Sequence, residues 1–228
     1  MLSVVIPACN EEKTIEKTIG DLVIFFKKEG IDYEIVVVED GSKDKTAEVV
    51  KKISKKNPNI RLIHHKKRLG KGKAVRIGFK KAKGNLLLTY DADASMPPTE
   101  IKKLLRAIEK RACIVVGSRY IKGARIKENK IRLIFSRIFN FLFRLLFFNV
   151  QDTQSGYKLI NAPAMKLILP HLKSDGFEWD VEFLKIAKEK GVYIKEIPIV
   201  WIQRGVSKVN PISDGIKMFI SLFKLRFG

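Results

Sequence analysis

The first 118 residues alternate short apolar runs with amphipathic segments, a pattern typical of strands that alternate with helices. The apolar runs are short and contain many Val, Ile and Leu residues, as strands of a buried parallel sheet do. They predict strands over Ser3–Ile6, Glu34–Val38, Ile60–Ile63, Leu86–Tyr90 and Ala112–Gly117. Repeated strand–helix units of this length indicate an α/β fold with a mostly parallel sheet flanked by helices.

The segments between these runs carry apolar residues at helical spacing. We expect Pro7 to end the first strand and Asn10–Glu12 to open a helix, because acids suit the first turn of a helix. The apolar stripe of this helix consists of Ile15, Ile19, Leu22, Val23 and Phe26. Further helices are predicted from near Asp44, over Gly70–Lys83 and after Pro97–Pro98.

The second half of the chain is less regular. Ile131–Phe148 is predicted to be a helix, and it holds six of the 14 Phe residues, interleaved with Arg132, Arg137 and Arg144. So much hydrocarbon cannot all face one small core, and the pattern suits a helix in a membrane interface, with a core helix or a dimer interface as the alternative. The other predicted elements are a turn and strand over Asp152–Ile160, helices over Ala162–Leu169, Glu178–Lys190 and Ile212–Phe227, and strands over Val192–Ile197 and Ile199–Ile202, split by Pro198.

Nothing in the composition divides the chain. We find no internal repeat and no low-complexity linker, so we expect one domain over residues 1–228. No apolar stretch reaches the length of a membrane span, and the first residues lack the basic segment of a signal peptide. The only two cysteines, Cys9 and Cys113, predict no disulfide framework and fit a reducing cytosol.

Charge is where the composition is unusual. The chain has 45 Lys and Arg against 24 Asp and Glu, a net charge of +21, and residues 51–83 hold 14 Lys or Arg and no acid. Such a chain is expected to meet polyanions, which means nucleic acid, anionic lipid or phosphorylated small molecules, unless the basic face only keeps the protein soluble. The absence of aromatic residues from Lys51 to Arg76 and of a recognisable nucleic-acid module disfavours nucleic acid.

The candidate chemistry follows the predicted strands, because ligands of parallel sheets bind beyond the carboxyl ends of the strands. Asp91-Ala92-Asp93 comes directly after Leu86–Tyr90. Two carboxylates spaced i, i+2 after a strand can reach one divalent cation, which in turn can bridge a diphosphate. The alternative for this pair is a solvated turn that caps a helix.

Two glycine-containing segments are further candidates. Asp40-Gly41-Ser42 follows the second strand, where a carboxylate can accept from a base N–H or a ribose hydroxyl, although an ordinary turn is the alternative. Leu69–Ala74 resembles a phosphate cradle but lacks the G-x-x-x-x-G-K-[ST] spacing, and no G-x-G-x-x-G follows the first strand. Kinase-like and NAD-dependent functions are therefore disfavoured.

Several of these segments occur together, and in this order, in one enzyme family. They are Val4–Glu11, Val38–Ser42, Arg68–Gly72 with Arg76–Phe79, Asp91–Asp93, Gly117–Tyr120, Asp152–Lys158 and Gly205–Val209. Over nearly its whole length the chain resembles family-2 glycosyltransferases with the GT-A fold. Within that family it is most similar to the polyprenyl (dolichyl) phosphate sugar synthases, in particular the dolichyl-phosphate β-glucosyltransferase branch.

The resemblance implies a nucleotide-sugar donor, UDP-glucose or GDP-mannose. It places Asp40 against the base, Asp91 against the nucleotide sugar, and Asp93 on a Mg²⁺ or Mn²⁺ ion that bridges the diphosphate. Mannosyl members carry at the position of Ser95 a Gln that joins the metal shell, so Ser95 favours glucose, as does the stretch Asp152–Gly156. The full set expected to bind the nucleotide sugar is Pro7, Asn10, Glu11, Asp40, Lys73, Asp91, Ala92, Asp93, Arg204 and Lys208.

The resemblance also implies an acceptor, the phosphate of a long isoprenoid lipid. A phosphomonoester has a second pKa of about 6, so this acceptor is already anionic near neutral pH and needs little help from a general base. The site must instead hold two anions close together, which requires cations. The resemblance assigns Arg119, Arg132 and Ser136 to the lipid phosphate, and Arg204 and Lys208 to the donor phosphates on a loop that Gly205 allows to close.

The sequence therefore predicts an inverting, metal-dependent transferase that moves a hexose onto polyprenyl phosphate, with Asp91, Asp93 and Arg119 as catalytic residues. Residues 1–118 would bind the nucleotide sugar, and residues 119–228 would bind the acceptor and the cytoplasmic face of a membrane. The alternatives are mannosyl transfer, another acceptor, a basic nucleic-acid-binding protein, and an inactive scaffold, which the presence of both acids argues against. Gln203-Arg204-Gly205 does not match the Q-x-x-R-W motif of processive members.

Overall fold

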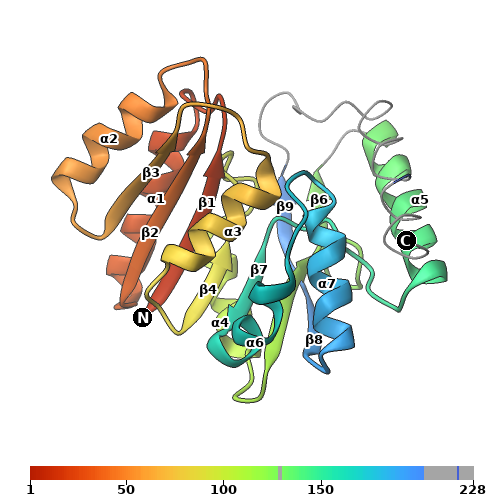
Figure 1. Cartoon of the computed structure of the whole chain (residues 1–228). Coiled ribbons are helices and arrows are strands. Elements are labelled where there is room, and N and C mark those ends of the chain that lie inside the picture. The colour runs from red at the N-terminus through yellow and green to blue at the C-terminus, as the bar shows by residue number, and fades with distance from the viewer. Residues whose placement is uncertain (128–129, 203–219, 221–228) are drawn as a thin grey trace.

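A seven-stranded sheet forms the centre of this computed structural model, which describes residues 1–127, 130–202 and 220 (Figure 1). Its order is β3-β2-β1-β4-β7-β5-β8. The strands are β1 (Leu2–Ala8), β2 (Tyr33–Asp40), β3 (Ile60–His65), β4 (Leu86–Thr89), β5 (Cys113–Ser118), β7 (Lys158–Asn161) and β8 (Tyr193–Pro198). All neighbours are parallel except β7, which runs antiparallel to β4 and β5. The prediction of a mostly parallel sheet is confirmed.

Helices cover both faces of the sheet (Figure 1). They are α1 (Ile15–Glu29), α2 (Thr46–Lys56), α3 (Lys71–Lys81), α4 (Ile101–Ala107), α5 (Lys130–Leu146), α6 (Ala162–Ile168) and α7 (Trp179–Glu189), with 3₁₀ turns at Pro98–Glu100 and Leu169–His171. Side chains of each strand alternate between two apolar cores: Ile35 and Val37 pack with α1, α2 and α4, whereas Val36 and Val38 pack with α3, α6 and α7. Because both faces are buried, the strands read as continuous apolar runs.

The first helix begins later than predicted. The backbone N–H groups of Asn10, Glu11 and Glu12 donate to the side chains of Ser42, Thr46 and Asp44, which lie between the end of β2 and the first residue of α2. These long-range bonds hold residues 10–12 outside the helix, and Asn10 takes a left-handed conformation with φ 56°. Helix α1 therefore starts at Ile15.

Of the two strand-ending roles predicted for proline, the one at Pro7 is wrong and the one at Pro198 is confirmed. Pro7 lies inside β1, which pairs with β4 only as far as Val5, so one side of the strand needs no N–H at that point. Pro198 is the last residue of β8 and pairs with Ser118.

A small second sheet was not predicted from the sequence. It consists of β6 (Arg125–Lys127) paired in parallel with β9 (Val200–Ile202). The three residues of β6 carry no periodic signal, and they form a strand only because β9 lies beside them. Among the described residues no helix is both long enough and apolar enough to cross a membrane. The predicted helix Ile212–Phe227 lies outside the described residues.

Candidate active site

The parallel strands bring the predicted chemistry to one edge of the sheet. The carboxyl ends of β1, β2, β4 and β5 share this edge, since neighbouring parallel strands run in the same direction. Asp40 is the last residue of β2, Asp91 comes just after β4, and Arg119 comes directly after β5. Residues far apart in the sequence are thus gathered as the strand pattern predicts.

Asp91 forms an ion pair that the sequence analysis did not identify. Its Oδ1 accepts from Lys71 Nζ at 3.0 Å, at the start of α3. Burial alone would raise the pKa of Asp91, but the positive charge of Lys71, with smaller contributions from Arg119 and Lys158, lowers it. A Cβ at Gly156 would lie 2.0 Å from Asp91 Oδ2, so any larger residue at this position would displace the carboxylate. Asp91 is therefore held as an anion in a fixed place.

Asp93 differs from Asp91. Its Oδ1 accepts from the backbone N–H of Ser95 at 3.0 Å, and in the part of the chain that the structure describes it forms no ion pair. Burial raises the pKa of Asp93, and so does the negative charge of Asp91. The two carboxylates repel each other, and an added cation would relieve that repulsion.

The residues present fit a divalent cation of the Mg²⁺ or Mn²⁺ type. Carboxylate oxygens are the hard ligands that these ions prefer, and Mg²⁺ is commonly bound by one or two carboxylates together with substrate phosphates and water. No group of three or more His, Cys, Asp or Glu side chains among the described residues could hold a metal ion. The two acids therefore suit a cation that arrives with an anionic ligand rather than one enclosed by protein side chains.

A buried ion pair lies close enough to Asp91 and Lys71 to act on their charges. Lys158 is fully buried, and its Nζ contacts Asp180 Oδ1 and the carbonyl oxygen of Ser155. Burial lowers the pKa of Lys158 and raises that of Asp180, and each opposes the effect on the other. Asp180 also helps to raise the pKa of Lys71 against its burial, after the larger contribution of Asp91. Positive and negative side chains thus alternate in the order Lys158, Asp180, Lys71 and Asp91.

The segment that resembles a phosphate cradle has another use. The N–H groups of Gly72 and Lys73 donate to the carbonyl oxygens of Gly176 and Asp175, at 3.1 and 3.2 Å. A Cβ at Gly70 would lie 2.3 Å from the carbonyl oxygen of Asp175. These glycines make room for residues 174–176, and the amides of Gly72 and Lys73 already donate to that segment, which agrees with the absence of the phosphate-cradle spacing.

The same segment brings a lysine other than Lys73 to the acids, while the predicted contact of Lys73 with the nucleotide sugar stays a prediction. Lys73 was expected to bind the nucleotide sugar, but Lys71 is the residue that reaches Asp91. Lys71 is the first residue of α3, and Lys73 lies two positions further along the helix, half-buried. Positions two apart on a helix do not face the same way, so the structure does not bring Lys73 to the acids.

Asp40 organises the backbone around the expected nucleotide pocket. It is buried, and its two oxygens accept from the N–H groups of Leu69 and Gly70, at 2.5 and 3.0 Å. Its predicted contact with a base stays a prediction. Pro7, Asn10 and Glu11 lie at or after the carboxyl end of β1, next to the segment after β2, and Ala92 is buried between the two acids.

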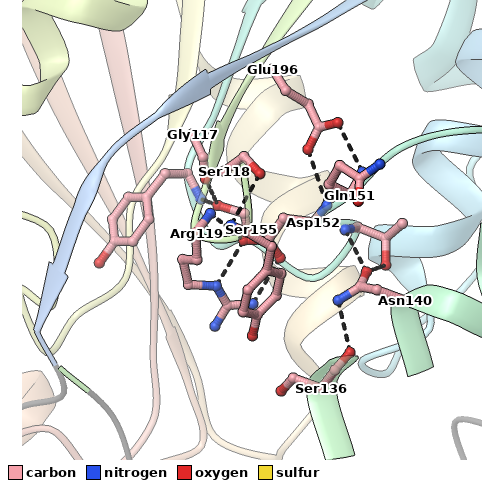
Figure 2. Close-up of polar contacts among 12 residues, drawn as sticks. Gly117, Ser118, Arg119, Ser136, Asn140, Gln151, Asp152, Ser155 and Glu196 are labelled. Carbon is pink, nitrogen blue, oxygen red and sulfur yellow. Dashed lines mark hydrogen bonds and ion pairs between the residues drawn. The ribbon is translucent and has the colours of Figure 1, made fainter. Parts of the chain in front are cut away.

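Arg119 is a buried, paired cation rather than a surface one. Its guanidinium donates to Asp152 through Nε and Nη2, both at 2.8 Å, and the Arg119 side chain is 7% exposed (Figure 2). Ser136 lies half-buried on α5, where its carbonyl oxygen accepts from Asn140 Nδ2. Arg132 belongs to α5, but its side chain is outside the described residues, as are Arg204 and Lys208.

Helix α5 has a buried face and an exposed apolar face. Phe139 and Phe143 are buried against the core, whereas four large apolar side chains are 46–71% exposed. These are Ile134, Ile138, Phe141 and Leu145. Beside them a hollow of about 410 Å³ is lined by Arg137 and Arg144 together with Tyr120, Asn140 and Gln151. As the sequence predicted, part of the apolar surface of this helix faces away from the core.

Comparison with known proteins agrees with this architecture. The model of the family described as glycosyl transferase family 2 matches residues 3–169. A dolichyl-phosphate beta-glucosyltransferase of Saccharomyces cerevisiae is 36% identical, over 99% of this chain and 74% of its own length. Relatives of the same name are 34% identical in Trichomonas vaginalis (97% of this chain, 69% of the relative) and 30% in Homo sapiens (99% and 74%).

Solved structures show the same fold. Glucosyl-3-phosphoglycerate synthase from Mycobacterium tuberculosis, in complex with Mn²⁺, UDP and glucosyl-3-phosphoglycerate, superposes with a TM-score of 0.73. The alignment covers 99% of this chain and 80% of that one, at 18% identity. This likeness confirms the predicted GT-A fold.

Proposed function

The chain belongs to glycosyl transferase family 2, and from that premise we propose that it transfers glucose from UDP-glucose to the phosphate of dolichol or another polyprenol. The observation that carries the proposal is the acid pair Asp91 and Asp93 at the carboxyl end of β4, in a chain similar over nearly its whole length to dolichyl-phosphate beta-glucosyltransferases. The Mn²⁺ and UDP-glucose held by structural neighbours support a metal-dependent donor site.

In the proposed reaction the donor lies over the acid pair. Asp93 and Asp91 would hold Mg²⁺ or Mn²⁺, which when bound neutralises the charge that develops on the departing diphosphate. Lys71, bonded to Asp91, adds a positive charge on the same side. Pro7, Asn10, Glu11 and Asp40 would line the nucleotide pocket, with Arg204 and Lys208 near the diphosphate.

The acceptor needs binding more than activation. An oxygen of the lipid phosphate attacks C1 of glucose from the face opposite UDP, so the new C1–O bond forms as the C1–O bond to UDP breaks and the configuration inverts. The phosphate is already anionic near pH 7, which removes the need for a general base. Arg119, Arg132 and Ser136 are the residues proposed to hold it against the repulsion of the donor diphosphate.

The exposed face of α5 supports attachment to a membrane surface. Its apolar stripe would enter the interface of the lipid layer, and Arg137 and Arg144 would meet anionic head groups. We place this attachment on the cytoplasmic side, where UDP-glucose would be available. The lipid acceptor would then reach the site without leaving the membrane.

The proposed function is tested with the full chain, radiolabelled UDP-glucose or GDP-mannose, and dolichyl phosphate or 3-phosphoglycerate as acceptor. We expect glucose on dolichyl phosphate only when Mg²⁺ or Mn²⁺ is present, and no transfer to 3-phosphoglycerate. Transfer of mannose would overturn the donor assignment, and transfer to 3-phosphoglycerate would overturn the lipid acceptor. A thermal shift with UDP and Mn²⁺, but not with GDP and Mn²⁺, reports the donor site separately from turnover.

Membrane attachment has a separate test. Ile138→Ser together with Phe141→Ser should abolish flotation with vesicles that contain anionic phospholipid, because two exposed apolar anchors are removed. Leu167→Ser is the matched control, since Leu167 is also exposed (41%) but lies on α6. Equal flotation of the α5 variant and the control would contradict the proposed membrane face.

A further inference from the structure

We propose that Asp152 is a positioning residue for the acceptor, acting through Arg119. The inference rests on the proposed function, because Arg119 is there assigned to the lipid phosphate. Asp152 lies 33 residues away from Arg119 in the sequence, in the segment before β7, and its side chain is fully buried. No role for this acid was identified from the sequence.

The contact with Asp152 fixes the orientation of the Arg119 guanidinium plane as well as its distance from the carboxylate. Arg119 Nε donates to Asp152 Oδ2 and Nη2 donates to Oδ1, both at 2.8 Å, and the backbone N–H of Arg119 donates to Oδ2 at 2.9 Å. A guanidinium has five N–H donors in one rigid plane, so engaging two of them sets the direction of the other three (Figure 2). The backbone bond fixes the start of the same side chain.

Asp152 is itself held from two sides. Its N–H and that of Gln151 donate to the two carboxylate oxygens of Glu196 on β8, at 3.0 and 2.8 Å. The neighbouring residue Thr153 donates through its N–H and its hydroxyl to Oδ1 of Asn140, at 2.9 and 2.8 Å. Asn140 is buried and belongs to α5 (Figure 2). The segment that orients Arg119 is therefore tied both to the sheet and to the helix that carries the exposed apolar face.

Charge alone does not explain this acid. A carboxylate next to an arginine that binds an anion weakens the attraction for that anion, because the pair is neutral overall. A buried ion pair is also a weak source of stability compared with apolar side chains of similar size. What Asp152 does supply is a single orientation of the guanidinium. A fixed donor geometry matters where a phosphate oxygen must approach C1 from one direction.

The first test replaces Asp152 with Asn. The amide offers one acceptor oxygen instead of two and turns an NH₂ group toward a donor, so the bidentate geometry is lost. We expect the KM for polyprenyl phosphate to rise about 10- to 100-fold, while the KM for UDP-glucose and the thermal shift with UDP and Mn²⁺ stay within about twofold. Equal changes in both KM values, or none, would overturn the proposal.

The matched control is a second arginine–carboxylate pair far from the site. Arg61 donates to Glu34 through Nε and Nη2, at 3.1 and 2.6 Å, and Glu34 is also buried. Glu34→Gln removes the same kind of charge from a pair whose carboxylate is buried, and we expect it to change the melting temperature and neither KM. A lipid KM that rises as much in this control as in Asp152→Asn would assign the effect to lost stability and overturn the positioning role.

A double-mutant cycle asks whether Asp152 acts through Arg119. Arg119→Lys keeps the charge but cannot form the two parallel bonds. In that background Asp152→Asn should raise the lipid KM by no more than about twofold further. Effects that multiply would show that Asp152 acts independently of Arg119 and would overturn the proposal.

Failure of the proposed function and failure of the positioning role give different results. If the unmodified chain transfers no glucose to polyprenyl phosphate, the proposed function fails whatever Asp152 does. If it transfers glucose but Asp152→Asn does not fold, Asp152→Glu replaces it, because one extra CH₂ in a fully buried position displaces the carboxylate while keeping its charge. A lipid KM unchanged in a folded Asp152→Glu would overturn the positioning role.

Discussion

The proposed donor and acceptor sides of the site balance charge in opposite ways. On the donor side Asp91 is paired with Lys71, whereas Asp93 has no ion-pair partner among the described residues. Burial raises the pKa of Asp93, and the negative charge of Asp91 raises it further. On the acceptor side Arg119 is already matched by Asp152 in a buried pair. The donor side leaves a negative charge to be balanced by a ligand, and the acceptor side is balanced before any ligand arrives.

This difference follows from what each side is proposed to bind. A diphosphate donor brings a divalent cation with it, so an acidic site without its own counter-charge suits the complex. A lipid phosphate comes without a metal, so its cation has to be supplied by the protein and held in position beforehand. The comparison therefore predicts that changes on the donor side act through charge and changes on the acceptor side act through geometry.

The largest effect is expected where the charge is unbalanced. Asp93→Ala should lower kcat about 10³-fold, because the ligand for the divalent cation on the diphosphate is lost. The fold should be retained, as judged by circular dichroism, while the thermal shift with UDP and Mn²⁺ disappears. A variant that kept both its activity and its metal-dependent shift would break the comparison on the donor side.

The second effect tests the fixed position of Asp91. In Gly156→Ala the new Cβ would lie 2.0 Å from Asp91 Oδ2, so the carboxylate must move, and kcat should fall about 10²-fold. Gly20→Ala is the matched control, because nothing lies within 4 Å of a Cβ on that residue of α1. The control should stabilise the protein by about 0.5–1 kcal/mol and leave transfer unchanged. Equal activity of the two variants in the transfer assay would contradict the role given to Asp91.

The third effect compares two lysines on one helix. Lys71→Met removes the hydrogen-bonded cation from Asp91, and we expect about a tenfold loss of kcat/KM for UDP-glucose, the size of a lost charge-assisted hydrogen bond. Lys73→Met removes the same charge two residues away and should change kcat/KM less than about threefold. If steady-state kinetics showed a larger loss for Lys73→Met, the assignment made from the structure would be reversed.

The smallest effect on activity is expected for the pair of Arg61 and Glu34, which lies far from the site. This pair shows what an arginine bonded to a buried carboxylate does for stability alone. Burial would raise the pKa of Glu34, but bonds from Ser3, from the N–H of Lys83 and from Arg61 lower it below its ordinary value of 4.5. A carboxyl whose pKa is lowered by folding stabilises the fold above its unfolded pKa, and this contribution is lost as the pH falls.

Glu34→Gln should therefore cost about 1–3 kcal/mol of unfolding free energy at pH 7. The difference from the unmodified protein should shrink below about pH 4.5, where the unfolded carboxyl takes up its proton. Urea unfolding at pH 7 and pH 4 measures both values. A difference that stayed constant with pH would show that the charge of Glu34 contributes nothing.

Local patterns were sufficient for most elements of the sheet and for the acid pair. The strands are continuous apolar runs because both of their faces are buried, and the acids follow β4 because ligands of parallel sheets bind at that edge. The same patterns failed at Pro7, at the start of α1 and at β6. In each case a distant segment decided the structure. Strand β4 stops pairing with β1 before Pro7, the side chains of residues 42–46 hold residues 10–12 outside α1, and β9 pairs with β6.

The sequence by itself thus determined the order of strands and helices, the edge where chemistry gathers, the exposed apolar character of α5, and the family resemblance. Only the tertiary structure decided that Lys71 rather than Lys73 reaches Asp91 and that Arg119 is paired with Asp152. It also decided that Gly70 and Gly72 pack against the backbone of residues 174–176. Periodicity reports which side of an element is buried, because that depends on neighbours within one or two turns. The partner of a buried charge depends on how distant elements pack, and no local pattern carries that information.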